Sequence, residues 1–104
     1  SAGPGEDTAS IRQRCLVARQ RALQRQGATN HSLSGQAIDT HTQLDAAAVR
    51  FLQTAATQMG WSARSTHRTL KIARTIADLA GADTTSLAHV AEAMQYRRAL
   101  RQKN

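Results

Sequence analysis

The sequence contains few aromatic residues and a single cysteine. Its aromatics are Phe51, Trp61 and Tyr96, too few for the stacking platform on which single-strand nucleic-acid binders hold bases. Cys15 has no second cysteine to pair with, so an internal disulfide is excluded. No apolar run approaches the roughly 20 residues of a membrane span, and no leader-like apolar stretch opens the chain. We therefore expect a cytoplasmic location and no membrane partner.

Motifs for catalysis and metal binding are also missing. The four histidines lack the close spacing of a zinc site, and the carboxylates are scattered rather than paired for acid–base chemistry. The chain has no glycine-rich phosphate loop ending in Gly-Lys-Ser or Gly-Lys-Thr. We expect no metal ligands, no cofactor bound by this chain alone and no enzymatic activity in isolation.

Basic residues dominate the charge. Fourteen lysines and arginines oppose seven acids, for a net charge of +7, and twelve of the fourteen are arginines. Arginine favours planar, bidentate contacts with phosphate or carboxylate groups. At 104 residues the chain has room for one domain with a modest core, and the charge indicates a phosphate-bearing partner.

Apolar residues recur at steps of three and four, which predicts helices and no strands. The fold class is therefore all-α, a small bundle of about four helices. We expect helices at 8–26, 46–59, about 63–80, and from just after Thr85 or Ser86 to near the end. This pattern divides the chain into a flexible N-terminus (1–7), a connecting amphipathic helix (8–26), a linker (27–43) and a three-helix unit (44–104).

The linker has turn-forming residues and no sustained period, so it is expected to pack only through Leu33 and Ile38. The apolar faces of the last three expected helices predict the core. Trp61 is expected to close the end of the bundle. The predicted core residues are Val49, Leu52, Ala56, Leu70, Ala73, Ile76, Ala77, Leu87, Val90, Ala91 and Met94.

Four cations follow one side of the predicted third helix. Arg64, Arg68, Lys71 and Arg74 are spaced by four, three and three residues, close to the repeat of a helix face. Arg64 falls in the first turn, beside backbone amides that favour an anion. The alternative interpretation of Arg64 is an ordinary surface arginine. The row of four cations can equally be a solvated helix face.

Several blocks of sequence, in this order, carry a family resemblance. They are IRQRCLVARQRALQRQ (11–26), the spaced Asn30, Leu33 and Gly35, WSAR (61–64), HRTLKIARTIADLAG (67–81) and HVAEAMQYR (89–97). Together they resemble the C-terminal domain of bacterial magnesium chelatase-like AAA+ ATPases. The sequence departs from that family at Thr85 and Ser86, where an isoleucine and a capping residue are expected, which leaves the start of the last helix open.

The resemblance implies the helical lid of a P-loop ATPase, with residues 44–104 as a three-helix lid. The nucleotide-binding core, with its ATP and magnesium, would then lie outside this chain. In such lids a sensor-2 arginine reaches the terminal phosphate, and the matching position is Arg64, with Arg68 as its neighbour. Lys71 and Arg74 are further candidate contacts for phosphate or a partner. The implied partners are an upstream P-loop domain, neighbouring subunits of a homo-oligomeric ring, and DNA, since related motors act in DNA processing or uptake.

Two other classes of function compete with the lid. A basic helical module that binds nucleic acid without ATP would need several cations on one exposed surface. A helical adaptor that binds proteins would need an exposed apolar groove, which the sequence does not reveal.

Overall fold

The computed structural model describes residues 7–102, with side chains described through residue 98. Within this part the chain forms five α-helices and one short 3-10 helix, and no strands. The elements are α1 (Thr8–Gln26), η1 (Asn30–Ser32), α2 (Gln36–Thr42), α3 (Ala46–Met59), α4 (Ala63–Leu79) and α5 (Leu87–Gln102). The all-α class is confirmed, with one helix more than expected. The expected flexible N-terminus lies outside the described residues, apart from Asp7.

Local capping explains where three of the helices begin. Asp7, Asp45 and Ser62 precede α1, α3 and α4, and each side chain accepts a hydrogen bond from a backbone amide in the first turn. Helices α1 and α3 end at Gly27 and Gly60, whose φ angles of 74° and 63° lie in the left-handed region that glycine adopts at little cost. These boundaries agree with those predicted from the sequence.

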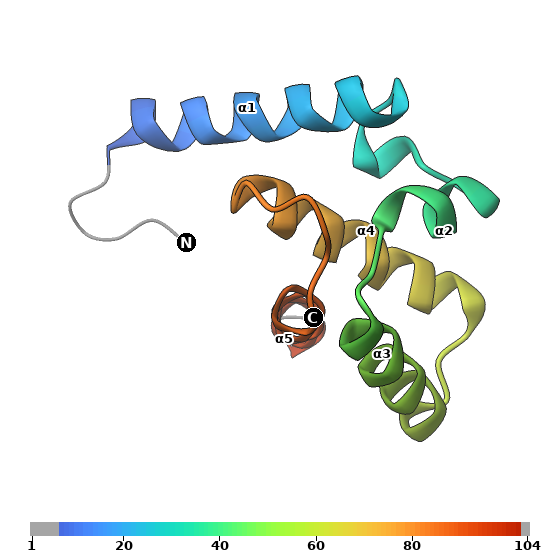
Figure 1. Cartoon of the computed structure of the whole chain (residues 1–104). Helices are drawn as coiled ribbons and strands as arrows, with labels where there is room; N and C mark the ends of the chain where they lie inside the picture. The colour runs from blue at the N-terminus through green and yellow to red at the C-terminus, as the bar shows by residue number, and fades with distance from the viewer. Residues whose placement is uncertain (1–6, 103–104) are drawn as a thin grey trace.

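Helix α4 is the centre of the fold. It contacts α1, η1, α2 and α5, while α3 packs against α5. In Figure 1, α1 runs along one edge of the molecule, and α4 separates it from α3 and α5. The N-terminal end of α4 lies near α2 and α3, and its C-terminal end lies beneath α1. The two ends of α4 therefore meet different neighbours.

The core lies mainly between α4, α5, α3 and the segment that precedes α3. Five of the eleven predicted core residues are buried: Leu52, Leu70, Ala73, Ala77 and Val90. Leu87 was expected there but is 40% exposed, because it occupies the first turn of α5, and the other five are partly buried. Leu33 and Ile38 pack into the core as predicted, and Trp61 packs against it. Small residues that the predicted core did not include are buried as well: Ala18, Ala22, Ala48, Ala55 and Ala93.

The stretch 27–43 was predicted to lack regular structure, and this is wrong. It contains η1 and the short helix α2, which follows Gly35 at a φ of 55°. A helix of 7 residues makes about two turns, too few for a recognisable apolar period. The separation of the chain at this stretch into a connecting helix and a lid stays a prediction.

Thr85 joins the start of α3 to the start of α5. Its hydroxyl donates to the carbonyl of Thr42 at 2.6 Å, and its amide donates to the carbonyl of Gln43 at 3.0 Å. The amide of Asp45 in turn donates to the carbonyl of Thr85 at 3.1 Å. Thr85 is fully buried, and α5 begins at Leu87, where the sequence predicted. The departure from the family pattern at this position is thus accommodated by a polar side chain with a hydrogen-bond partner.

Candidate functional site

The N-terminal end of α4 carries the proposed nucleotide-sensing arginine. The Ser62 hydroxyl accepts from the amide of Ser65 at 3.1 Å, and the carbonyl of Ser62 accepts from the amide of Thr66 at 3.0 Å. Arg64 therefore lies in the first turn of a capped helix, where the backbone dipole is positive. An anion that approached this end would meet both the dipole and the guanidinium of Arg64.

Helix α5 holds this end of α4 in place through Arg97. Its Nη1 atom donates to the carbonyl of Ser65 at 2.9 Å and to the hydroxyl of Thr69 at 2.8 Å. The guanidinium carbon also lies 5.7 Å from the centre of the Trp61 ring, within the range of a cation–π contact. Helical spacing in the sequence does not indicate this contact across the bundle.

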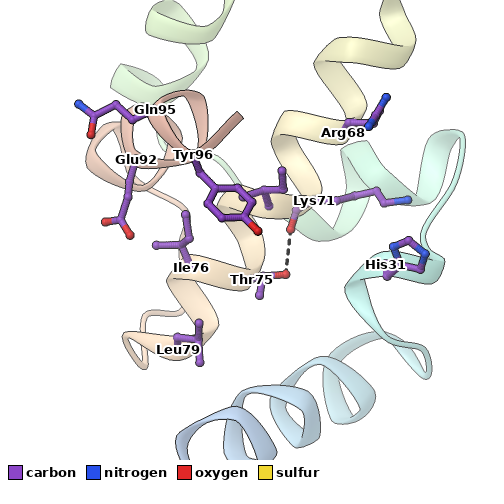
Figure 2. Close-up of a pocket in the computed structure, with 10 residues that line it drawn as sticks. His31, Arg68, Lys71, Thr75, Ile76, Leu79, Glu92, Gln95 and Tyr96 are labelled. Atoms are coloured by element: carbon purple, nitrogen blue, oxygen red, sulfur yellow. Dashed lines mark hydrogen bonds between the residues drawn. The ribbon is translucent and has the colours of Figure 1, made fainter. Parts of the chain in front are cut away.

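Arg64 and Arg68 are both exposed and lie one turn apart on α4. Among the residues with described side chains, neither makes a hydrogen bond or an ion pair. Lys71 is more enclosed, because its ammonium donates to the carbonyl of Leu33 at 3.1 Å. Arg68 and Lys71 line the same hollow, shown in Figure 2, with His31 beside Lys71.

Arg74 lies inside the domain, so the exposed row of cations on α4 does not extend beyond Lys71. Its side chain is fully buried and donates to the carbonyls of Ala82 at 2.6 Å and Asp83 at 2.9 Å. The guanidinium also pairs with the Asp78 carboxylate at 2.9 Å. We therefore leave Arg74 out of the candidate site, because these contacts hold the turn after α4 and keep the guanidinium inside the domain.

Asp78 is the centre of a buried ionic cluster that joins α1 to α4. Its carboxylate accepts two hydrogen bonds from Arg25, at 2.9 and 3.1 Å, and one from Asn30 at 2.8 Å, in addition to the contact with Arg74. Burial raises the pKa of Asp78, but the hydrogen bonds from Arg25 and Asn30 and the charge of Arg74 outweigh it, so the pKa is lowered. Burial lowers the pKa of Arg74, and the Asp78 charge opposes that change.

The described residues show neither a metal-binding cluster nor a membrane-spanning helix. No cluster of three histidine, cysteine or acidic residues capable of holding a metal ion occurs among them. The exposed guanidinium of Arg64 fits a phosphate oxygen, but a magnesium ion would need ligands from elsewhere. No helix among the described residues is long and apolar enough to cross a membrane.

The fold and this site define a small all-α domain built around one central helix with an exposed arginine at its start. The chain belongs to the family described as magnesium chelatase, subunit ChlI C-terminal, whose model matches residues 5–97. The resemblance inferred from the sequence blocks is therefore confirmed.

Three relatives illustrate the match. Competence protein ComM of Haemophilus influenzae is 37% identical over 97 residues, which cover 93% of this chain and 19% of that protein. The uncharacterized protein YifB of Salmonella typhimurium is 38% identical, over 92% of this chain and 19% of that protein. The uncharacterized protein Rv2897c of Mycobacterium tuberculosis is 37% identical, over 93% and 20%. The chain thus spans about a fifth of the length of these relatives. No solved structure matches it significantly.

Proposed function

We propose that this chain is the helical lid of an AAA+ ATPase and that Arg64 senses the nucleotide bound by a core outside the chain. The observation that carries the proposal is the position of Arg64, exposed and without a partner among the described side chains, at the capped start of the central helix. The family match supports the lid assignment. The greater length of the relatives supports a separate core that binds ATP and magnesium.

In this proposal Arg64 donates hydrogen bonds from its planar guanidinium to oxygens of the terminal phosphate, which bears most of the charge that changes on hydrolysis. Loss of that phosphate removes the contact, and α4 is then free to shift relative to the core. Arg97 and Trp61 hold the start of α4 against α5, so a movement of Arg64 is transmitted to the bundle. Arg68, one turn further along α4, is the second nucleotide-sensing residue that we propose.

The motor that we propose assembles as a ring of like subunits in the cytoplasm and acts on DNA. The name of the Haemophilus relative, a competence protein, is consistent with work on DNA. Direct binding of nucleic acid by this chain alone is less well supported, because internal acceptors occupy several of its cations. These cations are Arg21, Arg25, Lys71, Arg74 and Arg97.

The test is Arg64→Ala in a protein that carries this domain together with its nucleotide-binding core. A charged hydrogen bond contributes about 1.5–3 kcal/mol, so we expect hydrolysis to slow by roughly 10- to 100-fold. Arg64→Lys should restore little activity, because an ammonium lacks the planar fork. The measurement is the steady-state ATPase rate of assemblies whose size has been checked by sedimentation.

Arg50→Ala is the matched control, since Arg50 is also an exposed helical arginine but lies on α3. It should hydrolyse ATP at the parent rate. Arg64→Ala should also leave the domain folded, with a free energy of unfolding within about 0.5 kcal/mol of the parent. A parent ATPase rate for Arg64→Ala in an intact assembly would overturn the sensor assignment and leave Arg64 an ordinary surface arginine.

A further inference from the structure

A groove open to solvent runs between α1 and α5 across the outer face of α4. It consists of two adjoining hollows, of about 860 and about 400 Å³, that share His31, Thr75 and Leu79. The larger hollow lies between α4, α5 and η1, and the smaller continues between α4 and α1. Figure 2 shows the larger one, with Glu92 and Tyr96 of α5 on one side and Lys71 and His31 on the other. We call these two hollows the α1–α5 groove.

The α1–α5 groove exposes apolar side chains that the fold does not bury. Leu16 is 50% exposed, Leu79 is 41% exposed and Tyr96 is 54% exposed. Ile72 and Ile76, both partly buried, extend this apolar surface along α4. Scattered exposed apolar residues need no explanation, but residues from three helices that line one concave surface are typical of a binding site.

Cations surround this apolar surface. Arg12 and Arg19 contribute from α1, and Arg68 and Lys71 from α4, whereas Glu92 is the only acid among the residues that line the groove. Lys71 bonds to a neutral carbonyl, so its positive charge is not cancelled there. The groove therefore combines an apolar floor with a positively charged rim.

We propose that the α1–α5 groove binds an acidic amphipathic helix of a partner protein. Such a helix would place apolar residues spaced by three and four on Leu16, Leu79 and Tyr96, with its acidic residues against the cationic rim. A second copy of this chain is a poor occupant, because each copy carries a net charge of +7. A nucleic-acid backbone would satisfy the cations but would leave the apolar floor without a complementary surface.

This proposal does not rest on Arg64, which lines neither hollow, and it shares only Arg68 with the nucleotide-sensing residues that we propose. The probe is a fluorescent peptide of roughly 18 residues, about five helical turns, with leucines at the apolar positions of an amphipathic helix and glutamates elsewhere. Binding to the 104-residue chain is followed by fluorescence anisotropy. A scrambled peptide of the same composition tests the apolar pattern, and a version with lysine in place of glutamate tests the charge. Both should bind at least about tenfold more weakly than the patterned acidic peptide.

Two matched pairs of variants locate the binding surface. Leu79→Gln should weaken binding by roughly three- to tenfold, whereas Leu87→Gln should not, although Leu79 and Leu87 are 41% and 40% exposed. Arg19→Gln should weaken binding by about two- to fivefold, whereas Arg50→Gln, another exposed helical arginine outside the groove, should not. Circular dichroism confirms that each variant is folded.

Three results would overturn the proposal. The first is absence of binding, or equal binding of the acidic, scrambled and basic peptides. The second is that, in both pairs, the groove variant and its control weaken binding of the acidic peptide equally. The third is evidence that something else occupies the groove. This would be a dimer of the chain that dissociates in the Leu79→Gln variant, as measured by sedimentation. It would also be binding of duplex DNA that Leu79→Gln weakens and Leu87→Gln does not.

Discussion

The two ends of α4 use the same residue type in opposite ways. At the N-terminal end, Arg64 is exposed and has no partner among the described side chains. Ten residues later Arg74 is fully buried, with Asp78 and two backbone carbonyls as acceptors. At one end the charge is exposed to solvent, and at the other end the charge is paired inside the fold.

The difference lies in what surrounds each guanidinium. Arg74 faces the turn that follows α4, and an acid lies one helical turn along the same face, so its desolvation is offset by fixed acceptors. Arg64 is exposed, and Arg97 of α5 bonds to the carbonyl of Ser65 beside it and to the hydroxyl of Thr69 rather than to any acceptor that would enclose Arg64. The guanidinium of Arg64 thus stays accessible although α5 holds the backbone beside it in place.

The largest expected loss of stability comes from removing the buried ion pairs near the C-terminal end of α4. Asp78→Asn removes the charge that Arg25 and Arg74 share. It leaves the buried guanidinium of Arg74 and the partly buried one of Arg25 without a carboxylate, and should cost about 3–5 kcal/mol of unfolding free energy. Urea denaturation measures this loss. Asp83→Asn is the control, because the Asp83 side chain is 98% exposed and its pair with Arg21 should contribute under about 1 kcal/mol. Equal midpoints for the two variants would contradict a stabilising role for the buried cluster.

A similar or slightly smaller loss of stability is expected from a core substitution midway along α4. Leu70 is 3% exposed in the core, so Leu70→Ala should cost about 2–5 kcal/mol through lost burial and a residual cavity. Leu79→Ala, on the same helix but 41% exposed, should cost under about 1 kcal/mol. Thermal unfolding compares the two. If Leu70→Ala melted within a degree or so of the parent, Leu70 would not be a core residue.

The smallest of the three effects is the response to acid. Because the pKa of Asp78 is lowered on folding, its contribution to stability is present above its ordinary value of 3.8 and is lost as the pH falls below that value. The free energy of unfolding should therefore fall with acid more steeply in the parent than in Asp78→Asn. Urea midpoints at several pH values on both sides of 3.8 test this. Parallel curves for the two proteins would show that Asp78 titrates alike when folded and unfolded.

Most of the fold could be predicted from the sequence, because local rules govern it. Asp45 and Gly60 bound α3 at the predicted residues, since capping and left-handed φ depend on near neighbours. Helix α2 could not be predicted, because its 7 residues are too few to show a sustained apolar period and because it depends on Ile38 reaching a core built by other helices. Helix α2 is missing from the prediction because no local sequence pattern indicates it.

The candidate site was only partly predictable. Helical spacing and family resemblance select Arg64 and Arg68, and the structure leaves both exposed. The same spacing selects Arg74, which the structure buries, because a three-to-four-residue repeat does not show which side of a helix another element will cover. The α1–α5 groove could not be predicted from the sequence either, since residues from α1, η1, α4 and α5 form it together.

The sequence by itself determined the helical class, most helix boundaries and the cations of α4, because these follow from interactions within a few residues of one another. Only the tertiary structure decided which of those cations remain available to a ligand. The pairing of Arg25 with Asp78 spans 53 residues, and whether such a pair forms depends on how α1 docks against α4. Burying a charge is costly unless a partner is fixed beside it, so long-range packing separated the arginines that hold the fold from those that can act.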